Sequence, residues 1–422
     1  MTLGGSLRSK RLNWKSKSRR GSSPAAVSRN ACNNSPTRTA GFFPQDGRRL
    51  LKPERRPRTL RGLCGEIKLT LRYGRDPRDQ RWCCPLLEAW GVRAHQEFTP
   101  AVRRRLAFTL SASGTYAEAA ELATEWGVAV DDSTLHALAQ EAGARAEEQT
   151  LRRLETPAPE REPGRAPSAL SVLMIDGCQM RYRGSGWGKT NPKEPRVEWH
   201  ELKLGVFYRE EQATQTAGGR GLLSGKRIVS WRGEAGELGR RLHWEAQADG
   251  LGRALRVRSV NDGAPWIWNL VTDRWSQAEQ VLDFYHASQH LHALGAALHG
   301  DGTDATSAWV GPRRKRLRRG NALKLLKEVK ALAPPAGAAA AVVRREQNYF
   351  EHHAARMNYR ELSRHGPIGS GAVESACRQR QCRFKRAGQF WSEEGMKHLC
   401  ALQEARRNDH WEELWALPFQ PR

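Results

Sequence analysis

Three acidic residues stand in a pattern that could bind divalent cations. Asp176 and Asp262 each follow an apolar run typical of a buried strand, and each precedes a glycine. Glu374 lies in the segment GPIGSGAVESACRQ, whose glycines and proline predict a turn that opens a helix. Because functional groups gather at strand ends in α/β sheets, we expect the two aspartates to lie close together. One Asp-Gly pair alone is more simply a turn, and the combination of all three acids favours a site.

Paired carboxylates of this kind suit phosphodiester chemistry. Two Mg²⁺ ions roughly 3.5–4 Å apart can stabilise the charge on both the entering and leaving oxygens and lower the pKa of the attacking water. Mg²⁺, or Mn²⁺ in its place, prefers oxygen ligands and keeps several waters, so three carboxylates suffice for two ions. We therefore predict Asp176, Asp262 and Glu374 as catalytic and metal-binding residues. Asp283 also follows a predicted strand and rivals Asp262.

The composition favours a polyanionic partner. The 422 residues include 70 Lys and Arg against 45 Asp and Glu, a net charge of +25. No apolar run approaches the roughly 18 residues of a membrane span, and the N-terminus has no apolar signal region. The cysteines form no regular disulfide framework, which fits a reducing compartment. We expect a cytoplasmic protein that does not bind membranes.

Two basic segments are predicted to contact DNA phosphates. One lies in residues 311–330, where a solvated helix face would mix charges of both signs. The other is the helix behind Glu374. The predicted phosphate contacts are Arg313, Arg314, Lys315, Arg316, Arg318, Arg319, Arg378, Arg380, Arg383, Lys385 and Arg386.

The N-terminal third divides into three predicted parts. Residues 1–60 hold about half of the net charge and few core-forming residues, which predicts a disordered leader. This leader is either a phosphate-binding arm or a non-native extension. In the small β segment 61–95, the alternation from Gly65 to Arg72 predicts a strand. Its cysteines, Cys64, Cys83 and Cys84, lack the two CxxC pairs of a zinc ribbon, which favours an absent or decayed metal site.

Residues 96–155 are expected to form a helix-turn-helix-like DNA-binding domain. One helix covers 115–126, and a second begins after Asp132 beyond a short turn with Gly127. His136 and Gln140 on the second helix could read base edges. A purely structural helical pair is the alternative.

The remainder is predicted to be a mixed α/β domain after a Pro-rich linker at 156–168. Three strands, a helix and further strand–helix units describe a mixed sheet flanked by helices. The predicted strands are 171–175, 202–208, 227–231, 255–260 and 278–284, with a helix over 237–255. His286, His290 and His292 lie on a helix and are more simply packing or phosphate contacts than a metal trio. We read Cys377 and Cys382 as core thiols. Trp266, Trp268 and Trp391 could stack on a base, although core packing is the simpler reading of each.

Several short blocks resemble the DDE transposases of bacterial insertion sequences, specifically the Kra-type group. They span about residues 95–415 and lie at Met174–Gly177, Glu198–Val206, Asn261–Ile267, Asp283–Ala287, Gly366–Gln379 and Lys385–Trp391. The first 60 residues match nothing in that family. The resemblance implies an RNase H-like five-stranded sheet over residues 169–299, a basic helical insertion at 300–358, and C-terminal helices of the catalytic core at 359–422. It also implies that Asp176, Asp262 and Glu374 are the catalytic triad.

The resemblance further implies metal-dependent cleavage and strand transfer at insertion-sequence ends. The expected partners are double-stranded DNA, as element ends and target, and further copies of the chain, in the bacterial nucleoid. Two alternatives remain at this stage. One is an inactive or decayed nucleic-acid-binding protein, and the other is an RNase H-like nuclease without strand transfer.

Overall fold

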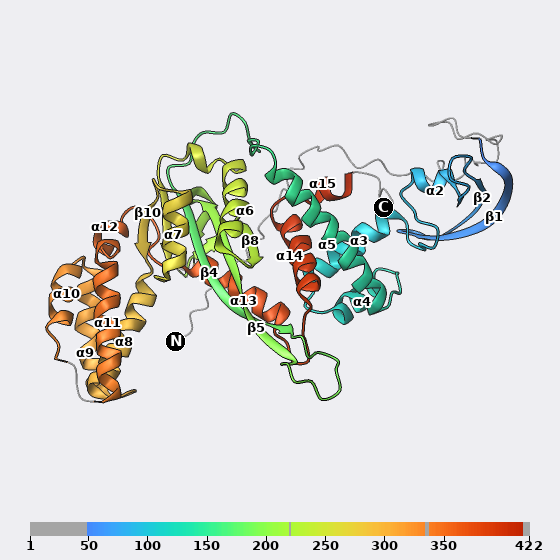
Figure 1. Cartoon of the computed structure of the whole chain (residues 1–422). Coiled ribbons are helices and arrows are strands. Elements are labelled where there is room, and N and C mark those ends of the chain that lie inside the picture. The colour runs from blue at the N-terminus through green and yellow to red at the C-terminus, as the bar shows by residue number, and fades with distance from the viewer. Residues whose placement is uncertain (1–48, 219–220, 334–336, 417–422) are drawn as a thin grey trace, which may run out of the picture. The chain divides into compact units, whose positions relative to one another are not determined.

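The computed structural model describes residues 49–416, except 219–220 and 334–336 (Figure 1). Its described residues form two compact units. The smaller unit contains residues 49–60 and 66–97, and the larger contains residues 61–65 and 98–416.

The smaller unit is built on a three-stranded sheet of order β1-β2-β3, followed by a short helix. The elements are β1 (Leu51–Gly62), β2 (Gly65–Arg75), β3 (Trp82–Cys83) and α2 (Pro85–Ala89). Period-two alternation in β2 buries Leu71 against Leu60 and Leu87. The expectation of disorder up to residue 60 is therefore wrong for residues 51–60, because they pair as an edge strand, where charged residues and prolines are tolerated. Residues 1–48 lie outside the described part.

The cysteines of this region differ in exposure. Cys64 is exposed, Cys83 is half-buried and Cys84 is buried in the small core. Within the described part of the chain, no three His, Cys, Asp or Glu side chains are close enough to hold one metal ion.

Three helices open the larger unit: α3 (Pro100–Ala112), α4 (Tyr116–Glu125) and α5 (Asp132–Leu154). Each begins at a residue whose side chain accepts a backbone N–H of the first turn, namely Thr99, Thr115 and Asp131. The following segment, predicted as a linker, is held against helix α6 (Ala235–Ala248). Its Arg161 N–H donates to the Ala248 carbonyl at 2.9 Å, and the Trp244 indole donates to the Thr156 carbonyl at 3.0 Å.

A five-stranded mixed sheet forms the centre of the larger unit. Its strands are β4 (Ser171–Arg183), β5 (Val197–Arg209), β8 (Arg227–Arg232), β9 (Val257–Asn261) and β10 (Glu279–Leu282). Their order is β10-β9-β4-β5-β8. Within this sheet β4, β5 and β8 pair antiparallel, and β9 and β10 add parallel on the other side of β4. This is the strand order and direction of an RNase H-like fold.

Helices cover both faces of this sheet, as Figure 1 shows. Odd-numbered residues of β4 such as Leu173 and Ile175 pack with α6 (Ala235–Ala248) and α7 (Pro265–Arg274). Even-numbered residues such as Met174 and Met180 pack on the opposite side, where α13 (Gly371–Phe384) contacts β4 and β5. Period-two alternation therefore sorts the side chains of each strand between two helical layers.

The remaining elements lie after β5. They are the small hairpin β6 (Ala213–Gln215) and β7 (Gly221–Leu223), then α8 (Phe284–His299), α9 (Asp304–Arg318), α10 (Ala322–Lys330), α11 (Ala338–His353), α12 (Tyr359–Leu362), α14 (Glu393–Arg407) and α15 (Trp411–Ala416). The segment expected to be a helical insertion thus holds α9, α10 and α11. No helix among the described residues has the length and hydropathy of a membrane span.

Several sequence-predicted boundaries differ from the structure, and three of the differences have clear local causes. β4 continues to Arg183 because alternation resumes after Asp176, with Cys178, Met180 and Tyr182 buried. The helix predicted to reach residue 255 ends at Ala248, because Gly250 adopts a left-handed conformation with φ +90°. The fifth strand ends at Leu282, where Asp283 caps α8.

Candidate active site

The sheet register brings Asp176 and Asp262 together. β4 and β9 pair in parallel at Ser171 with Val257 and at Leu173 with Ser259. Continued without a shift, this register sets Asp176 beside Asp262. Both side chains point to the face of α13, because each lies two residues beyond a core residue of that face, Met174 or Val260.

Asn261 immediately precedes Asp262 at the end of β9 and was not singled out as a functional residue from the sequence. Its side chain is fully buried, and its Oδ1 accepts the Ile175 N–H at 2.8 Å. Its Nδ2 donates to Ser259 Oγ at 2.8 Å. A side chain thus continues the contact between β4 and β9 where their paired residues end. The place of Asn261 next to Asp262 in the sequence could have drawn attention to it, but no periodicity predicts its hydrogen bond to Ile175.

The electrostatics at Asp176 are those of crowded, partly buried acids. Burial raises the pKa of Asp176, and the nearby charges of Asp262 and Glu374 raise it further. Hydrogen bonds from the Gly177 N–H, at 2.6 Å, and the Cys377 thiol oppose this shift. Positive charge in this space would therefore be stabilised.

A residue of α11, Tyr349, helps to hold the turn at Asp262. Asp262 Oδ1 accepts the Ala264 N–H at 3.0 Å, and its carbonyl accepts the Tyr349 hydroxyl at 2.9 Å. Gly263 has φ +107°, and a Cβ there would come within 3.0 Å of His353 Nε2. The turn therefore requires glycine for both backbone conformation and space.

A chain of ring contacts supports Tyr349. Its ring stacks on His290 with centroids 3.5 Å apart, and His290 Nδ1 bonds to the fully buried Glu346. His286 packs edge-on against His290 at 4.9 Å. His286 and His290 therefore take part in packing that positions Asp262. Burial lowers the pKa of His353 to about 4, which keeps its imidazole neutral beside Gly263.

Glu374 lies in the first turn of α13 and is exposed. Its Oε1 accepts the Ser370 hydroxyl at 2.6 Å, which orients the carboxylate toward the start of the helix. Since α13 packs on β4, this exposed acid and the strand-borne Asp176 belong to one face of the sheet.

Asp283, the rival to Asp262, has a different role. It is fully buried, and its Oδ1 accepts the His286 N–H at 2.7 Å, capping α8. Its Oδ2 accepts the Ser370 N–H. Both oxygens are thus used to fix the turn that carries Glu374. Among the two strand-end candidates, Asp262 is the accessible one.

The loop before Glu374 is also anchored by a buried cation. Arg258 on β9 is 1% exposed and donates to the carbonyls of Leu362, at 2.7 Å, and Pro367, at 3.2 Å. Its Nε donates to Glu279 at 2.8 Å. Strand β9 therefore positions both Asp262 and the loop that leads to Glu374.

The donor set fits Mg²⁺ in kind. Three carboxylates converge within electrostatic range, and hard oxygen donors are the ligands that Mg²⁺ takes. They do not form a three-residue cage for one ion anywhere in residues 49–416 that the structure describes. Mg²⁺ rarely needs one, because it binds one or two carboxylates and completes its shell with water and substrate phosphate.

The arginines of α13 divide into two groups. Arg378, one turn beyond Glu374, is exposed, as is Arg386 just after the helix, which also pairs with Glu118. The prediction that Arg380 and Arg383 contact phosphates is wrong. Arg380 is 3% exposed and bonds to Gln403 and Glu404 of α14.

Arg383 is 6% exposed and lies among aromatic rings. Its guanidinium carbon is 5.8 Å from the ring centroids of Tyr116 and Trp391 and 5.7 Å from that of Phe384. Amphipathic periodicity did not separate these inward arginines from Arg378 because arginine occupies both faces of α13.

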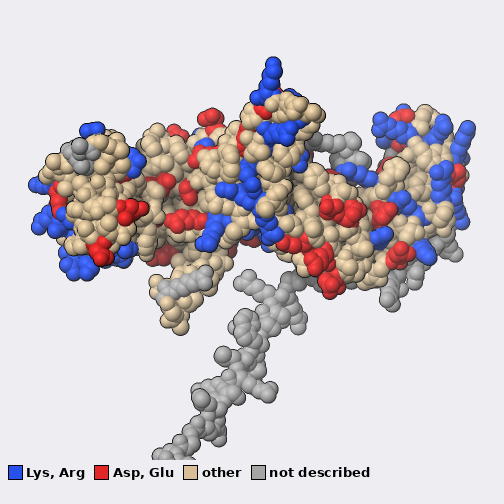
Figure 2. Space-filling view, turned by 90° about the horizontal axis from the view of Figure 1, so that it is seen from below, with Lys and Arg blue, Asp and Glu red and all other residues tan. Residues whose placement is uncertain are grey.

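The basic segment of the insertion divides in the same way. Arg313 and Arg316 both pair with Glu328, whereas Arg314, Lys315, Arg318 and Arg319 are exposed. Figure 2 shows Lys and Arg side chains gathered over the insertion, at the left of the view. Arg314 and Arg318 also approach the ring of Phe284, at 5.6 and 5.3 Å, directly after Asp283. Exposed arginines of α9 therefore lie near the turn that positions Glu374.

The second helix of the expected DNA-reading pair is largely a packing element. α5 packs along α14, and Gln140 Oε1 pairs with His398 Nδ1 at 2.9 Å. Gln140 therefore faces α14 in this structure. His136 is exposed, and its ring lies 5.6 Å from that of Tyr116.

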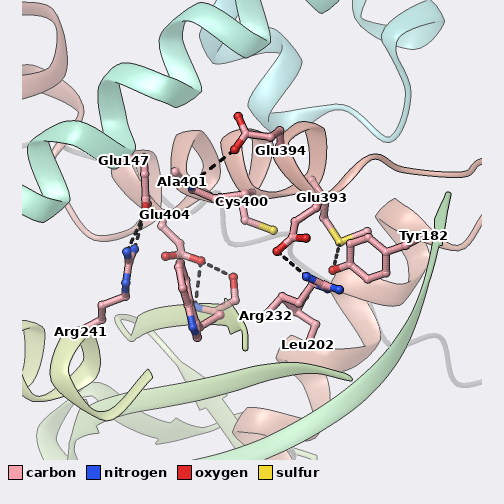
Figure 3. A pocket seen from close by; sticks show the side chains of 14 residues that line it. Glu147, Tyr182, Leu202, Arg232, Arg241, Glu393, Glu394, Cys400, Ala401 and Glu404 are labelled. Atoms are coloured by element: carbon pink, nitrogen blue, oxygen red, sulfur yellow. Dashed lines mark hydrogen bonds and ion pairs between the residues drawn. The ribbon is translucent and has the colours of Figure 1, made fainter. Parts of the chain in front are cut away.

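A cavity of about 190 Å³ lies apart from the three carboxylates, between α5, α14 and the sheet. Figure 3 shows the Arg241–Glu147 pair, the Arg232–Glu393 pair and Glu404 in its wall. Burial raises the pKa of Glu404 to about 7. Its lining residues include none of the candidate catalytic acids.

Comparisons with known proteins add little to this geometry. No family model matches the chain, and no curated protein matches it significantly. Among solved structures, the strand transfer complex of the Drosophila P element transposase is similar at a TM-score of 0.26 and 10% identity. That match covers 79% of this chain and 82% of the other. A likeness this faint carries no argument, so function is argued from the site.

Proposed function

We propose that this protein is a metal-dependent DNA strand transferase, a DDE-type transposase of a bacterial insertion sequence. One observation carries the proposal. In an RNase H-like sheet, the β4–β9 register sets Asp176 beside Asp262, on the face where α13 presents Glu374. Three carboxylates held close together repel one another, and this repulsion destabilises the fold unless cations bind between them. In a strongly basic chain, such cations would also bind the phosphate of a nucleic acid.

Each acid has a distinct part in the proposed reaction. Asp176 and Asp262 come from adjacent parallel strands and fix the position of the reacting phosphate relative to the sheet. Glu374, exposed and oriented by Ser370, closes the site from the helix side. Bound Mg²⁺ would neutralise charge on the entering and leaving oxygens and lower the pKa of the attacking water. Arg378, one helical turn further, is placed to contact a neighbouring phosphate.

The site alone supports metal-dependent phosphodiester chemistry, and further observations support the more specific assignment as a transposase. The Kra-type sequence blocks support it, as do the exposed arginines of α9 near Phe284. We propose double-stranded element ends as the first substrate and target DNA as the second. Because two ends must be held at once, we also propose that the chain acts as a homo-oligomer on DNA.

Strand transfer is tested with the purified full chain. Labelled duplexes from both boundaries of the genetic element that carries the gene are incubated with supercoiled plasmid and Mg²⁺ or Mn²⁺. We expect metal-dependent nicking and labelled plasmid products, and Asp262→Asn should remove both while leaving duplex affinity within twofold.

The products separate the alternatives. Cleaved duplex without labelled plasmid would indicate a nuclease without strand transfer. Duplex binding with neither product, in both metals, would indicate a non-catalytic DNA-binding protein. Full activity of the Asp262→Asn variant would contradict the site assignment.

A further inference from the structure

The β4–β5 hairpin extends well past the catalytic aspartate. The two strands stay paired as far as Arg183 with Val197, about 23 Å beyond Asp176 at roughly 3.3 Å per residue. Residues 385–391, which follow α13, run beside the same end of β4. The Arg183 N–H donates to the Trp391 carbonyl at 2.8 Å. Both catalytic elements, β4 after Asp176 and α13 after Glu374, therefore lead into one surface.

That surface carries alternating cations and aromatic rings. The Trp187 and Phe390 rings lie 4.9 Å apart. The Arg183 guanidinium lies 5.3 Å from the Trp187 ring, and that of Arg181 lies 5.2 Å from the Phe390 ring. Arg181 also donates to the Lys385 carbonyl at 2.9 Å, which ties the hairpin to the segment after α13.

Trp199 is the most accessible ring of the group. It is 54% exposed, and Trp187 is 39% exposed. Trp199 pairs across the strands with Arg181, and the Lys385 ammonium lies 5.1 Å from its ring. In contrast, Trp268 and Trp391, weighed from the sequence as base-stacking residues, are buried core residues. An exposed indole beside cations matches the chemistry that binds unpaired nucleotides.

The hairpin tip is internally braced. The Gly184 N–H donates to the Arg196 carbonyl at 2.9 Å, and the Gly186 N–H donates to the Pro195 carbonyl at 3.1 Å. A Cβ on Gly184 would lie 2.3 Å from the Pro195 carbonyl oxygen, so the backbones approach too closely for a side chain. A braced tip holds Trp187 in place before any ligand binds, which lowers the entropic cost of binding.

The local charge is suited to a polyanion. Residues 181–199 include Arg181, Arg183, Lys189, Lys193 and Arg196 against Glu194 and Glu198. Glu194 lies 3.6 Å from Lys189, and Glu198 pairs with His200 at 3.0 Å. The basic side chains thus outnumber the acids, which are themselves paired, and phosphates would be attracted.

We propose that this hairpin surface, formed by Arg181, Arg183, Trp187, Trp199, Lys385 and Phe390, binds unpaired DNA at the end of the hairpin beyond Asp176. This inference rests on the proposed function. Unpaired bases are favoured over duplex because stacking on an indole needs an exposed base face, which neighbouring pairs cover in a duplex. Arg181 and Trp199 lie about 17 Å along the strands from the level of Asp176, and period-two alternation turns them to the opposite face of the strands from Asp176.

Binding is tested with a labelled oligo(dT) 15-mer and a matched duplex in metal-free buffer, for the full chain at fixed salt. Trp199→Ala should weaken oligo(dT) binding about tenfold and duplex binding less than twofold, and Trp199→Phe should retain most of the affinity. The matched control is Trp90→Ala, an exposed tryptophan of the smaller unit, which should change neither affinity. Far-UV circular dichroism verifies that each variant is folded.

An unchanged oligo(dT) affinity in folded Trp199→Ala would overturn the proposal, as would an equal loss on duplex. The test does not depend on catalysis, because metal-free buffer removes cleavage. If wild type binds oligo(dT) through Trp199 but never cuts DNA, the hairpin surface stands and the transposase assignment fails. If wild type transfers strands while Trp199→Ala binds oligo(dT) normally, the reverse holds.

Discussion

Asp176 and Asp262 are related by the same offset as the paired residues of β4 and β9. Ile175 and Asn261, the residues just before them, are 86 positions apart and joined by a hydrogen bond of 2.8 Å. Ser171 and Val257 keep the same register. The candidate site is therefore a consequence of parallel strand pairing, and any shift of β9 against β4 would separate the two acids.

Replacing either aspartate should remove strand cleavage. Asp176→Asn and Asp262→Asn each delete one charged ligand from a crowded acidic site, and metal-assisted charge stabilisation is worth several kcal/mol, or at least about 10³-fold in rate. Plasmid nicking measures the loss. Asp301→Asn, an exposed acid in the loop before α9, is the control and should cut at the wild-type rate.

Tyr349→Phe should lower activity through the position of Asp262. It removes the 2.9 Å hydrogen bond to the Asp262 carbonyl but keeps the ring that stacks on His290. We expect a 10- to 100-fold loss of kcat, as for other supports of ligand residues, with unchanged duplex affinity. The matched control is Tyr359→Phe, a buried tyrosine whose hydroxyl has no hydrogen-bond partner among the described residues. Equal effects of the two changes would contradict a positioning role.

Mg²⁺ should stabilise the folded chain. Burial and the charges of Asp262 and Glu374 raise the pKa of Asp176, so a divalent cation relieves repulsion in the folded state. At tenfold excess over the dissociation constant, binding adds about 1.4 kcal/mol, a rise in Tm of about 3 °C. Differential scanning fluorimetry measures the shift, and Asp176→Asn should abolish it. A wild-type Tm independent of Mg²⁺ and Mn²⁺ would argue against a metal site.

Two arginines of α13 should fail in different ways. Arg378→Ala removes an exposed charge, so it should weaken DNA binding and reduce the slope of log K against log salt by about 1. Arg380→Ala breaks a buried pair with Glu404 and should lower the free energy of unfolding by about 3–5 kcal/mol. Salt titrations and urea unfolding measure the two effects. A salt-slope change for folded Arg380→Ala would restore its predicted phosphate contact.

Stability should fall in acid through Glu245. Burial alone would raise its pKa, but the hydrogen bond and charge of His410 and the charge of Arg161 lower it to about 2. A depressed folded-state pKa adds stability above the ordinary value near 4.5, and this is lost as the pH falls toward 2. Glu245→Gln should therefore cost about 3 kcal/mol at pH 7 and progressively less below pH 4. A difference constant from pH 7 to pH 2.5 would contradict the shift.

Much of the fold was predictable because it depends on local pattern. Alternating apolar residues located the five strands, and turn residues located the loop before Glu374. The errors have local causes as well. β1 was assigned to a disordered leader because an edge strand can consist largely of exposed, charged residues. The end of β4 was missed because Asp176 and Gly177 interrupt its apolar run.

The site was only partly predictable. Asp176, Asp262 and Glu374 were predicted from the sequence, and their place on one face of the sheet fits that prediction without testing their role, whereas Asn261, Tyr349 and the positioning role of Asp283 were not predicted. Their hydrogen bonds join segments far apart in the chain, such as Tyr349 to Asp262, and periodicity reports only which face of its own element a residue occupies. The same limit placed Arg380 and Arg383 with the phosphate contacts.

The sequence by itself determined the chemical inventory: strand-end acids, a basic chain and a glycine-rich turn before Glu374. Tertiary structure alone decided which members of that inventory lie together. The parallel register placed Asp262 beside Asp176, burial turned Asp283 into a helix cap, and strand pairing past Asp176 exposed Trp199 while Trp391 entered the core. The physical reason is that pairing and burial depend on contacts between distant segments, and no local pattern records them.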